Sequence, residues 1–410
     1  MRTSAENTRR VHHGAIVALA LMTIITAVSS RMKADTGTCS GQSTTLPFTD
    51  VSGGNIFFCS IAEAFFSGLT NGTTSTTYSP GDPVPREQMA AFVSRTLDQS
   101  LKRGSRRAAL RQFWTPQGAN NLALTTVGTD PLLVESDGAD LWVANFTSAT
   151  VSRVNASDGR VVETWTGATK ATGVLVAMGK VFITGQTSAG SLYQVDPTQS
   201  AGAVTTLSTA LGSLSVGIAF DGQRIWIANN GNPGSVSMVT LNPTTVTNVT
   251  TGFFNPFGIL YDGANIWVTD LGDGDGKLKK LDSNGAILQS VTVGITPDHP
   301  AFDGTNIWVP NINSNTVSVV RATGGLAGTV IATLTGNGLN LPFQVAFDGE
   351  RILVTNSGGS SVSLWKASDL TPIGNFLTGA STNPGGVCSD GLNFWITLNV
   401  SGTSDKLARF

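Results

Sequence analysis

Apolar and polar positions alternate in short runs that recur about every 42 residues over most of the chain. A large apolar residue in the motif Asp-Gly-x-x-Ile-Trp-Val-x-Asn marks seven repeats, at steps of 40 to 45 residues. These anchors are Trp142, Phe182, Trp226, Trp267, Trp308, Leu353 and Trp395. A period of this length with short β patterns is typical of a β-propeller. We therefore expect an all-β fold with seven blades over residues 121–410.

Each repeat contains four strand patterns. In the fourth repeat we expect strands at residues 257–261, 265–269, 277–281 and 286–293. Asp262-Gly263 lies between the first two apolar runs, and this dipeptide is a strong hairpin signal. The first strand of each repeat is apolar with small residues, as expected of a strand that surrounds a central channel.

The seventh repeat is incomplete. It begins at Pro384 and stops at residues 406–410, which match a third strand. Residues 122–128, ahead of the first repeat, match a fourth strand. We therefore predict that this N-terminal strand joins the last blade, because the pairing would remove two exposed sheet edges.

A small helical segment precedes the repeats. Ile61, Ala62, Phe65 and Phe66 have the spacing of one apolar helix face, and Pro85 is placed for the first turn of a second helix. Two short helices bury little apolar surface, so a cross-link would stabilise them. Cys39 and Cys59, 20 residues apart, are the candidates for a disulfide.

The first 30 residues have the order of a secretory signal peptide. Arg2, Arg9 and Arg10 precede an apolar run at 15–28, and small residues follow. The run is short for a membrane span, although a retained anchor is the alternative. We expect an exported protein, at the cell surface, in the periplasm or outside the cell, with no transmembrane segment after cleavage.

Composition agrees with this organisation. Charged residues are only 13% of the chain, Gly is 47 of 410, and the net charge is −2. This excludes a disordered acidic or basic chain and a coiled coil, and it gives no support for nucleic-acid binding. The basic linker at 98–120 is either a solvated helix or a patch for anionic lipid or polysaccharide.

Residues 46–97 resemble an S-layer homology (SLH) module. The resemblance rests on Phe48-Thr49-Asp50-Val51, Gly68-Leu69-Thr70-Asn71-Gly72, Tyr78-Ser79-Pro80 and Val84-Pro85-Arg86-Glu87-Gln88-Met89-Ala90. It implies a small α-helical module that attaches to cell-envelope polysaccharide, with Arg86 against an acidic sugar. The alternative for Arg86 is a solvated side chain. Residues 121–410 in turn resemble the NHL/YVTN class of propellers, which specifies architecture more than function.

A polar column follows the second strands, three residues after each anchor. Asn145, Asn229, Asp270, Asn311 and Asn356 belong to it. These side chains are candidates for ligand binding at one mouth of the channel. Alternatively, they stabilise the bends after the strands.

His299 is the only histidine outside the N-terminal signal region, and Gln344 holds the corresponding place in the sixth repeat. A histidine at a channel mouth can act as a general base. Some propellers of this class, such as streptogramin lyases, use such a histidine with metal-binding acids. The sequence shows no evident partner acid for His299.

Asp270, Asp273 and Asp275 form a short acidic run, a weak candidate for a Ca²⁺ site. A hairpin turn is the favoured interpretation, and we predict no cofactor. The function we expect is non-enzymatic: a cell-envelope scaffold that binds a polysaccharide or a surface protein. The alternatives are a lyase or hydrolase acting through His299, and a structural surface-layer component.

Overall fold

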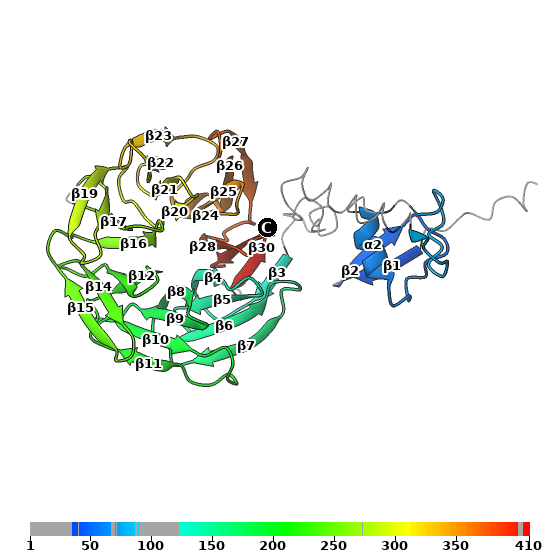
Figure 1. The fold of residues 1–410 in the computed structure, drawn as a ribbon, viewed down its shortest axis with the longest axis horizontal. Coiled ribbons are helices and arrows are strands. Elements are labelled where there is room, and N and C mark those ends of the chain that lie inside the picture. The colour runs from blue at the N-terminus through cyan, green and yellow to red at the C-terminus, as the bar shows by residue number, and fades with distance from the viewer. Residues whose placement is uncertain are drawn as a thin grey trace, which may run out of the picture. The chain divides into compact units, whose positions relative to one another are not determined.

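Seven four-stranded antiparallel sheets follow one another around a central axis over residues 123–410 (Figure 1). The computed structural model describes residues 35–39, 41–66, 70, 72–86, 89, 123–272, 274–400 and 405–410. The predicted signal at 1–30, the basic linker at 98–120 and most of the second predicted helix lie outside these residues. The chain divides into two units, one N-terminal and one containing the sheets.

The sheets are the blades of the predicted propeller, which the structure confirms. The first three blades are β4 (Pro131–Ser136), β5 (Asp140–Asn145), β6 (Thr150–Asn155) and β7 (Val161–Thr166); β8 (Ala171–Ala177), β9 (Lys180–Gly185), β10 (Ser191–Val195) and β11 (Thr205–Ser208); and β12 (Ser215–Phe220), β13 (Ile225–Asn229), β14 (Ser235–Thr240) and β15 (Thr245–Val249). The next three are β16 (Pro256–Tyr261), β17 (Ile266–Asp270), β18 (Lys277–Leu281) and β19 (Ile287–Thr292); β20 (Ala301–Phe302), β21 (Asn306–Asn311), β22 (Thr316–Arg321) and β23 (Val330–Leu334); and β24 (Pro342–Phe347), β25 (Arg351–Asn356), β26 (Ser361–Lys366) and β27 (Pro372–Leu377), with the short 3-10 turn η1 (Ser357–Gly359) between β25 and β26.

The seventh blade combines the two ends of the propeller. It contains β28 (Pro384–Ser389), β29 (Phe394–Leu398), β30 (Lys406–Arg409) and, from the N-terminal side, β3 (Ala123–Thr126). Leu124 pairs with Ala408 and Thr125 with Leu407 in an antiparallel register. Because β3 takes the fourth position, it covers the edge that β30 would otherwise expose and becomes the outer strand of the blade.

The Asp-Gly motif builds the hairpin between the first two strands of a blade. Asp262 Oδ1 accepts the backbone N–H groups of Ala264 at 2.8 Å and Asn265 at 2.6 Å. Its Oδ2 accepts the indole N–H of Trp267 at 2.7 Å. Gly263 has a φ of 95°, a backbone conformation that glycine adopts without steric cost. The motif therefore fixes the turn and the tryptophan together.

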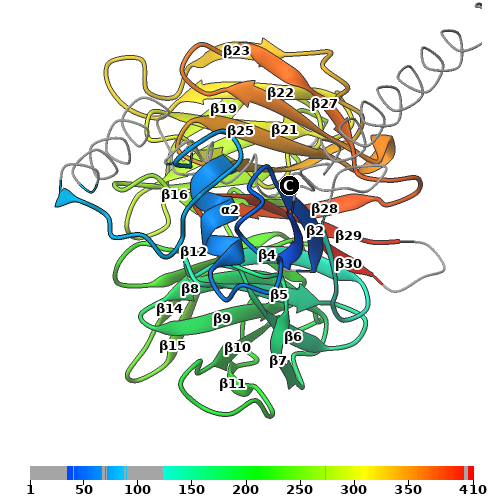
Figure 2. The same ribbon diagram turned by 90° about the vertical axis from the view of Figure 1, so that its right-hand side faces the viewer.

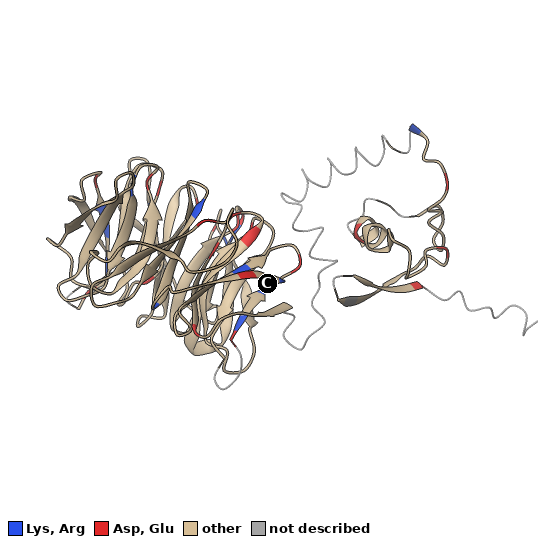
Figure 3. Cartoon of the chain, turned by 90° about the horizontal axis from the view of Figure 1, so that it is seen from below, with Lys and Arg blue, Asp and Glu red and all other residues tan. Residues whose placement is uncertain are grey.

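The core lies between the blades. Each interface between neighbouring blades holds its own cluster of buried apolar side chains. Six tryptophans are among the largest fully buried residues: Trp142, Trp226, Trp267, Trp308, Trp365 and Trp395. Charged residues are few and scattered over the blades (Figure 3). The sequence repeat is thus a repeat of interblade contacts.

The N-terminal unit contains a two-stranded sheet and one helix. β1 (Asp35–Cys39) pairs with β2 (Gln42–Leu46), and α2 (Phe58–Phe66) lies beside them (Figure 2). A disulfide joins Cys39 to Cys59, with 5.5 Å between their Cα atoms. The sheet was not predicted, and the expected helical module is not confirmed, because the structure describes one short helix there. Thr-rich residues 35–46 favour a strand over a helix, since β-branched side chains lose rotamer freedom in helices.

Candidate functional site

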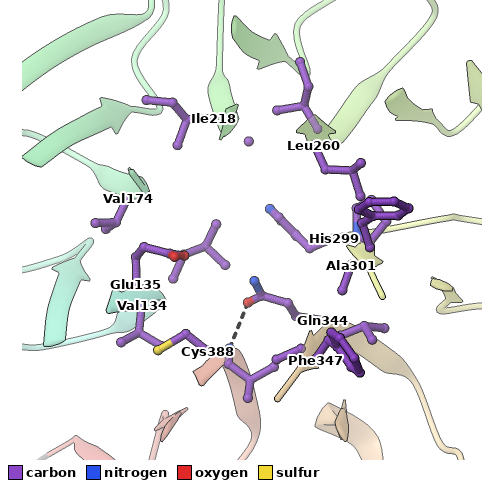
Figure 4. A pocket seen from close by; sticks show the side chains of 18 of the residues that line it. Val134, Glu135, Val174, Ile218, Leu260, His299, Ala301, Gln344, Phe347 and Cys388 are labelled. Carbon is purple, nitrogen blue, oxygen red and sulfur yellow. Dashed lines mark hydrogen bonds between the residues drawn. The ribbon is translucent and has the colours of Figure 1, made fainter. Parts of the chain in front are cut away.

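The first strands of the blades surround a cavity of about 420 Å³ at the centre of the propeller. Most of the lining residues have apolar side chains, among them Val134, Val174, Ile218, Ile259, Val345 and Val387, although polar atoms make up more of the surface that faces the cavity. Six lining residues carry polar or ionisable side chains: Glu135, Tyr261, His299, Gln344, Cys388 and Ser389. Figure 4 shows Glu135, His299, Gln344 and Cys388 pointing inward from different blades. This cavity is the candidate functional site.

Glycine at the third position of a first strand allows neighbouring blades to approach closely. A Cβ atom on Gly258 would lie 2.7 Å from Asp298 O, and one on Gly386 would lie 2.2 Å from Leu132 O. Both distances are far below van der Waals contact. At this register, His299 and Gln344 replace glycine in the fifth and sixth blades. Their side chains therefore enter a ring that is otherwise mostly backbone.

His299 is held by its neighbour in the chain. Its backbone N–H donates to Asp298 Oδ1 at 2.8 Å, and the same oxygen contacts the ring Nδ1. The Phe257 ring lies edge-on to the imidazole at 5.3 Å, and Phe343 is tilted against it at 5.5 Å. Nδ1–H donation to the carboxylate leaves Nε2 of the neutral ring as an acceptor.

The free nitrogen of this ring is buried. Within the described residues, His299 Nε2 has no hydrogen-bond partner. His299 itself is 6% exposed and Asp298 is 2% exposed. Burial raises the pKa of Asp298, against the opposing effect of the adjacent imidazole. The pair is an aspartate–histidine dyad with one acceptor atom open toward the cavity.

Gln344 is anchored to the next blade. Its Oε1 accepts the backbone N–H of Val387 at 2.9 Å, drawn as a dashed line in Figure 4. Its own backbone N–H donates to Thr355 Oγ1 at 3.1 Å. With the amide oxygen committed, the Nε2 group is the donor that Gln344 can offer to a ligand.

Glu135 lies on the opposite wall from His299 in Figure 4. It is half-buried on β4, at the point where that strand faces the cavity. Burial raises the pKa of its carboxyl from 4.5 to about 7, and a backbone N–H from Ser136 opposes the shift. A carboxyl of this kind gains or loses its proton near neutral pH.

Cys388 lines the cavity next to Glu135 in the neighbouring blade. Burial, followed by the negative charges of Glu135 and Asp390, raises the pKa of its thiol well above the ordinary value. The thiol therefore stays protonated at neutral pH, which is unfavourable for a nucleophile.

The polar column of the second strands does not line this cavity. Asn229 is fully buried and donates from Nδ2 to Ser235 Oγ at 3.1 Å and Ser237 Oγ at 2.8 Å, while its Oδ1 accepts from Ser215 Oγ at 2.7 Å. Asn145, Asn311 and Asn356 are also fully buried and donate to serine or threonine on the third strand. These amides join the end of the second strand to the third strand across the bend between them.

Asp270 in the same column is used internally. Its carboxylate accepts the backbone N–H groups of Phe254 at 3.0 Å and Asn255 at 2.8 Å, and it pairs with Lys279. Asp275 lies 3.9 Å from Lys277 Nζ, and Asp273 lies outside the described residues. Over the described part of the chain, no group of three or more His, Cys, Asp or Glu is arranged to hold a metal ion.

The N-terminal unit brings two parts of the SLH-like pattern together. Asp50 accepts the backbone N–H groups of Tyr78 at 2.8 Å and Ser79 at 2.7 Å. Arg86 is exposed. In the described ranges, no helix has both the length and the apolarity that a membrane crossing requires.

Sequence reasoning missed two members of the site. Asp298 was not assigned as the partner of His299, although it precedes it directly. Glu135 was assigned no role. The signal was its register: the corresponding positions of the other six first strands hold Leu175, Ala219, Leu260, Ala301, Ala346 and Cys388.

Comparison with known proteins supports the architecture. No family model matches the sequence, and no curated protein matches it. Among solved structures, streptogramin B lyase is similar over 70% of this chain and 97% of its own, with a TM-score of 0.57 and 15% identity. Hydrazine synthase of Kuenenia stuttgartiensis covers 70% of this chain and 98% of its own, with a TM-score of 0.57 and 17% identity. The Cps50 (Swd1) propeller domain of Myceliophteria thermophila covers 70% and 99%, with a TM-score of 0.56 and 12% identity.

Identities this low show the fold alone. The three similar proteins differ in what they do, as their names indicate. Function must therefore be argued from the residues of this chain's own cavity.

Proposed function

We propose that this chain is an exported binding protein whose propeller holds a small organic molecule in its central cavity. The observation that carries the proposal is the buried Nε2 of His299, which faces the cavity without a hydrogen-bond partner in the described residues. An unsatisfied buried polar atom costs about 1–3 kcal/mol. A ligand N–H or O–H group at this nitrogen would remove that cost.

The cavity has the character of a small-molecule site. Its volume of about 420 Å³ lies within the usual range for ligand pockets. Most of its lining residues are apolar, while polar atoms, including those of Glu135, His299 and Gln344, make up the larger part of the surface that faces the cavity. Apolar side chains supply affinity, and placed polar groups supply orientation and selectivity.

The dyad also favours acid–base catalysis as a second candidate. Asp298 orients His299 so that Nε2 can take a proton from a substrate. Glu135, with a pKa of about 7, can deliver a proton to a leaving group on the other side of the cavity. Elimination or hydrolysis of a small substrate would use the two groups in this way. We expected a non-enzymatic protein because the sequence shows no partner acid for His299. Asp298 and Glu135 are acids beside His299 and across the cavity from it, and they weaken that expectation.

The proposal includes the cellular location of the protein. The signal-like N-terminus, the disulfide and the SLH-like pattern support export and attachment to the cell envelope. Exposed Arg86 is suited to charge-assisted hydrogen bonds with an acidic sugar. On this proposal, the N-terminal unit holds an envelope polysaccharide or a surface protein, and the propeller holds the small molecule. A purely structural surface-layer role would use the first contact alone.

The cavity is tested by a fragment screen on the purified full chain with ligand-observed NMR. Ala301→Trp is the matched variant, because the larger side chain fills the cavity from a position of small residues. We expect a set of fragments that bind the wild type and lose binding in Ala301→Trp. Fragments that bind both proteins equally, with no others found, would contradict a site in the channel.

Catalysis and attachment have separate tests. Mass spectrometry of the bound fragments after incubation would reveal turnover, which His299→Asn and Glu135→Gln should abolish if the site is catalytic. Sedimentation with purified envelope polysaccharide tests attachment in the full chain and in a chain lacking residues 46–97. Equal binding by both chains would reject an anchoring role for the N-terminal unit.

A further inference from the structure

Glu135 is a single charge in an apolar register. On β4 it pairs with Trp142, and in the other six blades the residue paired with the corresponding anchor is uncharged. Nothing in the propeller repeat therefore requires a carboxyl at this place. A residue that departs from the repeat pattern of its fold is expected at a functional site.

The carboxyl of Glu135 also lacks a countercharge. Among the described residues that line the cavity, none is Lys, Arg or Asp. The ionisable groups that share the cavity with it are Cys388, Tyr261 and His299. A carboxylate in an apolar site is costly unless an opposite charge or several donors reach it. The described protein supplies one donor, the backbone N–H of Ser136.

We infer that the cavity takes a small organic cation, an ammonium group on an apolar body, with the ammonium paired to Glu135. The inference rests on the proposed function and names the class of ligand for the same site. The apolar body would contact Val134 and Val174 beside the acid and Ile218 and Val345 farther round the wall.

The far wall adds a second requirement. His299 Nε2 is an acceptor, so it selects a ligand N–H or O–H group. Gln344 offers a donor nearby. Because the described wall has no cationic side chain, an anionic ligand would meet only Glu135 and be repelled. The cavity is therefore selective for charge as well as for shape.

The test uses three probes of one shape and different charge: 2-phenylethylamine, 2-phenylethanol and phenylacetate. Each is titrated into the purified full chain at pH 8 by NMR. We expect the amine to bind at least tenfold more tightly than the alcohol, the effect of one charge-assisted hydrogen bond, and phenylacetate to bind most weakly. Glu135→Gln should remove the preference for the amine, whereas the matched control Glu163→Gln, on the outer strand β7, should retain it.

The outcomes separate the two proposals. If 2-phenylethanol or phenylacetate binds as tightly as the amine, and Ala301→Trp abolishes that binding, the inference of a cationic ligand is wrong but the binding site in the channel is supported. If a series of primary amines from butylamine upward fails to bind at 10 mM, the inference of a cationic ligand is also wrong. The fragment screen alone then decides whether the channel binds a small molecule.

A pH profile distinguishes pairing from a structural role of Glu135. The carboxyl, with a pKa of about 7, must be ionised to pair with the ammonium. Amine affinity should therefore fall about tenfold from pH 8 to pH 6 in the wild type. The profile should be flat in Glu135→Gln. The profile must persist in His299→Asn, and its disappearance there would overturn the assignment to Glu135.

Discussion

The indole N–H of Trp226 donates to Asp221 Oδ2 at 2.7 Å, and the aspartate belongs to the turn that precedes the tryptophan's strand. Asp221 Oδ1 also accepts the backbone N–H groups of Gln223 at 2.8 Å and Arg224 at 2.6 Å. The same indole–carboxylate bond recurs at Trp142, Trp267, Trp308 and Trp395. One aspartate thus joins the turn to the buried tryptophan in five of the blades.

Asp221→Ala should destabilise the propeller by about 2–3 kcal/mol, because it leaves the buried indole N–H and two backbone N–H groups without an acceptor. The measurement is the urea midpoint followed by tryptophan fluorescence. Asp369→Ala is the control, since this exposed turn aspartate accepts only from nearby Thr371. Equal shifts for the two variants would show that the tryptophan contact contributes little.

The same contact makes stability depend on acid. Burial opposes ionisation of Asp221, but the Trp226 indole and the backbone donors outweigh it and lower the pKa of the carboxyl. A lowered folded-state pKa stabilises the protein above the unfolded value of about 3.9, and this contribution is lost as the pH falls through the folded value. The difference in urea midpoint between wild type and Asp221→Asn should therefore shrink from pH 6 to pH 3. A difference that stays constant over this range would contradict the argument.

Closure of the ring depends on β3. Thr125→Pro should weaken the pairing of β3 with β30, because proline has no N–H to donate and fits poorly within a sheet. We expect a lower melting temperature and concentration-dependent aggregation, since the edge of β30 would be exposed. Thr125→Val is the matched control: it keeps the strand and removes only the 2.5 Å bond from Thr125 Oγ1 to Gly159 O. Similar aggregation in both variants would show that the hydroxyl, and not strand pairing, closes the ring.

Much of this architecture was predictable because it is repeated. Each anchor residue and each Asp-Gly turn occurs many times, so the period, the strand order and the missing strand could be found without a structure. The strand expected at 277–281 is β18 as observed. Repetition averages out the local ambiguity of short apolar runs.

The site was less predictable because it consists of exceptions to the repeat. His299 was recognised as an unusual residue, but its use of Asp298 depends on the backbone at the channel wall. The pKa of Glu135 depends on burial by other blades, which no local pattern reports. The buried asparagines had two interpretations, ligand binding or stabilisation of the bends after the strands, and only the structure shows that their amides bond to serine and threonine of the third strands.

The disulfide should stabilise the N-terminal unit without affecting the propeller. It closes a loop of 20 residues, which corresponds to about 3 kcal/mol in the chain-entropy account. Cys59→Ser should therefore increase amide hydrogen exchange in peptides covering residues 46–66. Peptides from β13 and β17 in the same experiment serve as the control and should be unchanged. Faster exchange in these propeller peptides would show that the two units unfold together.

Glu135→Gln should stabilise the ligand-free protein at alkaline pH. Because burial raises the pKa of the carboxyl to about 7, the folded protein binds a proton more tightly than the unfolded chain does. Stability that is present below the unfolded pKa of about 4.3 is lost as the pH rises through the folded value. At 1.36 kcal/mol per pKa unit, the rise from about 4.3 to about 7 corresponds to roughly 3–4 kcal/mol at pH 8, and contact of the half-buried side chain with water in the cavity reduces this to roughly 2–3 kcal/mol. The melting temperature of Glu135→Gln should exceed that of the wild type by several degrees at pH 8 and match it near pH 4. Glu163→Gln should show no such crossover, and a Glu135→Gln variant that is less stable at both values would mean that the carboxyl is ionised and well solvated in the folded state.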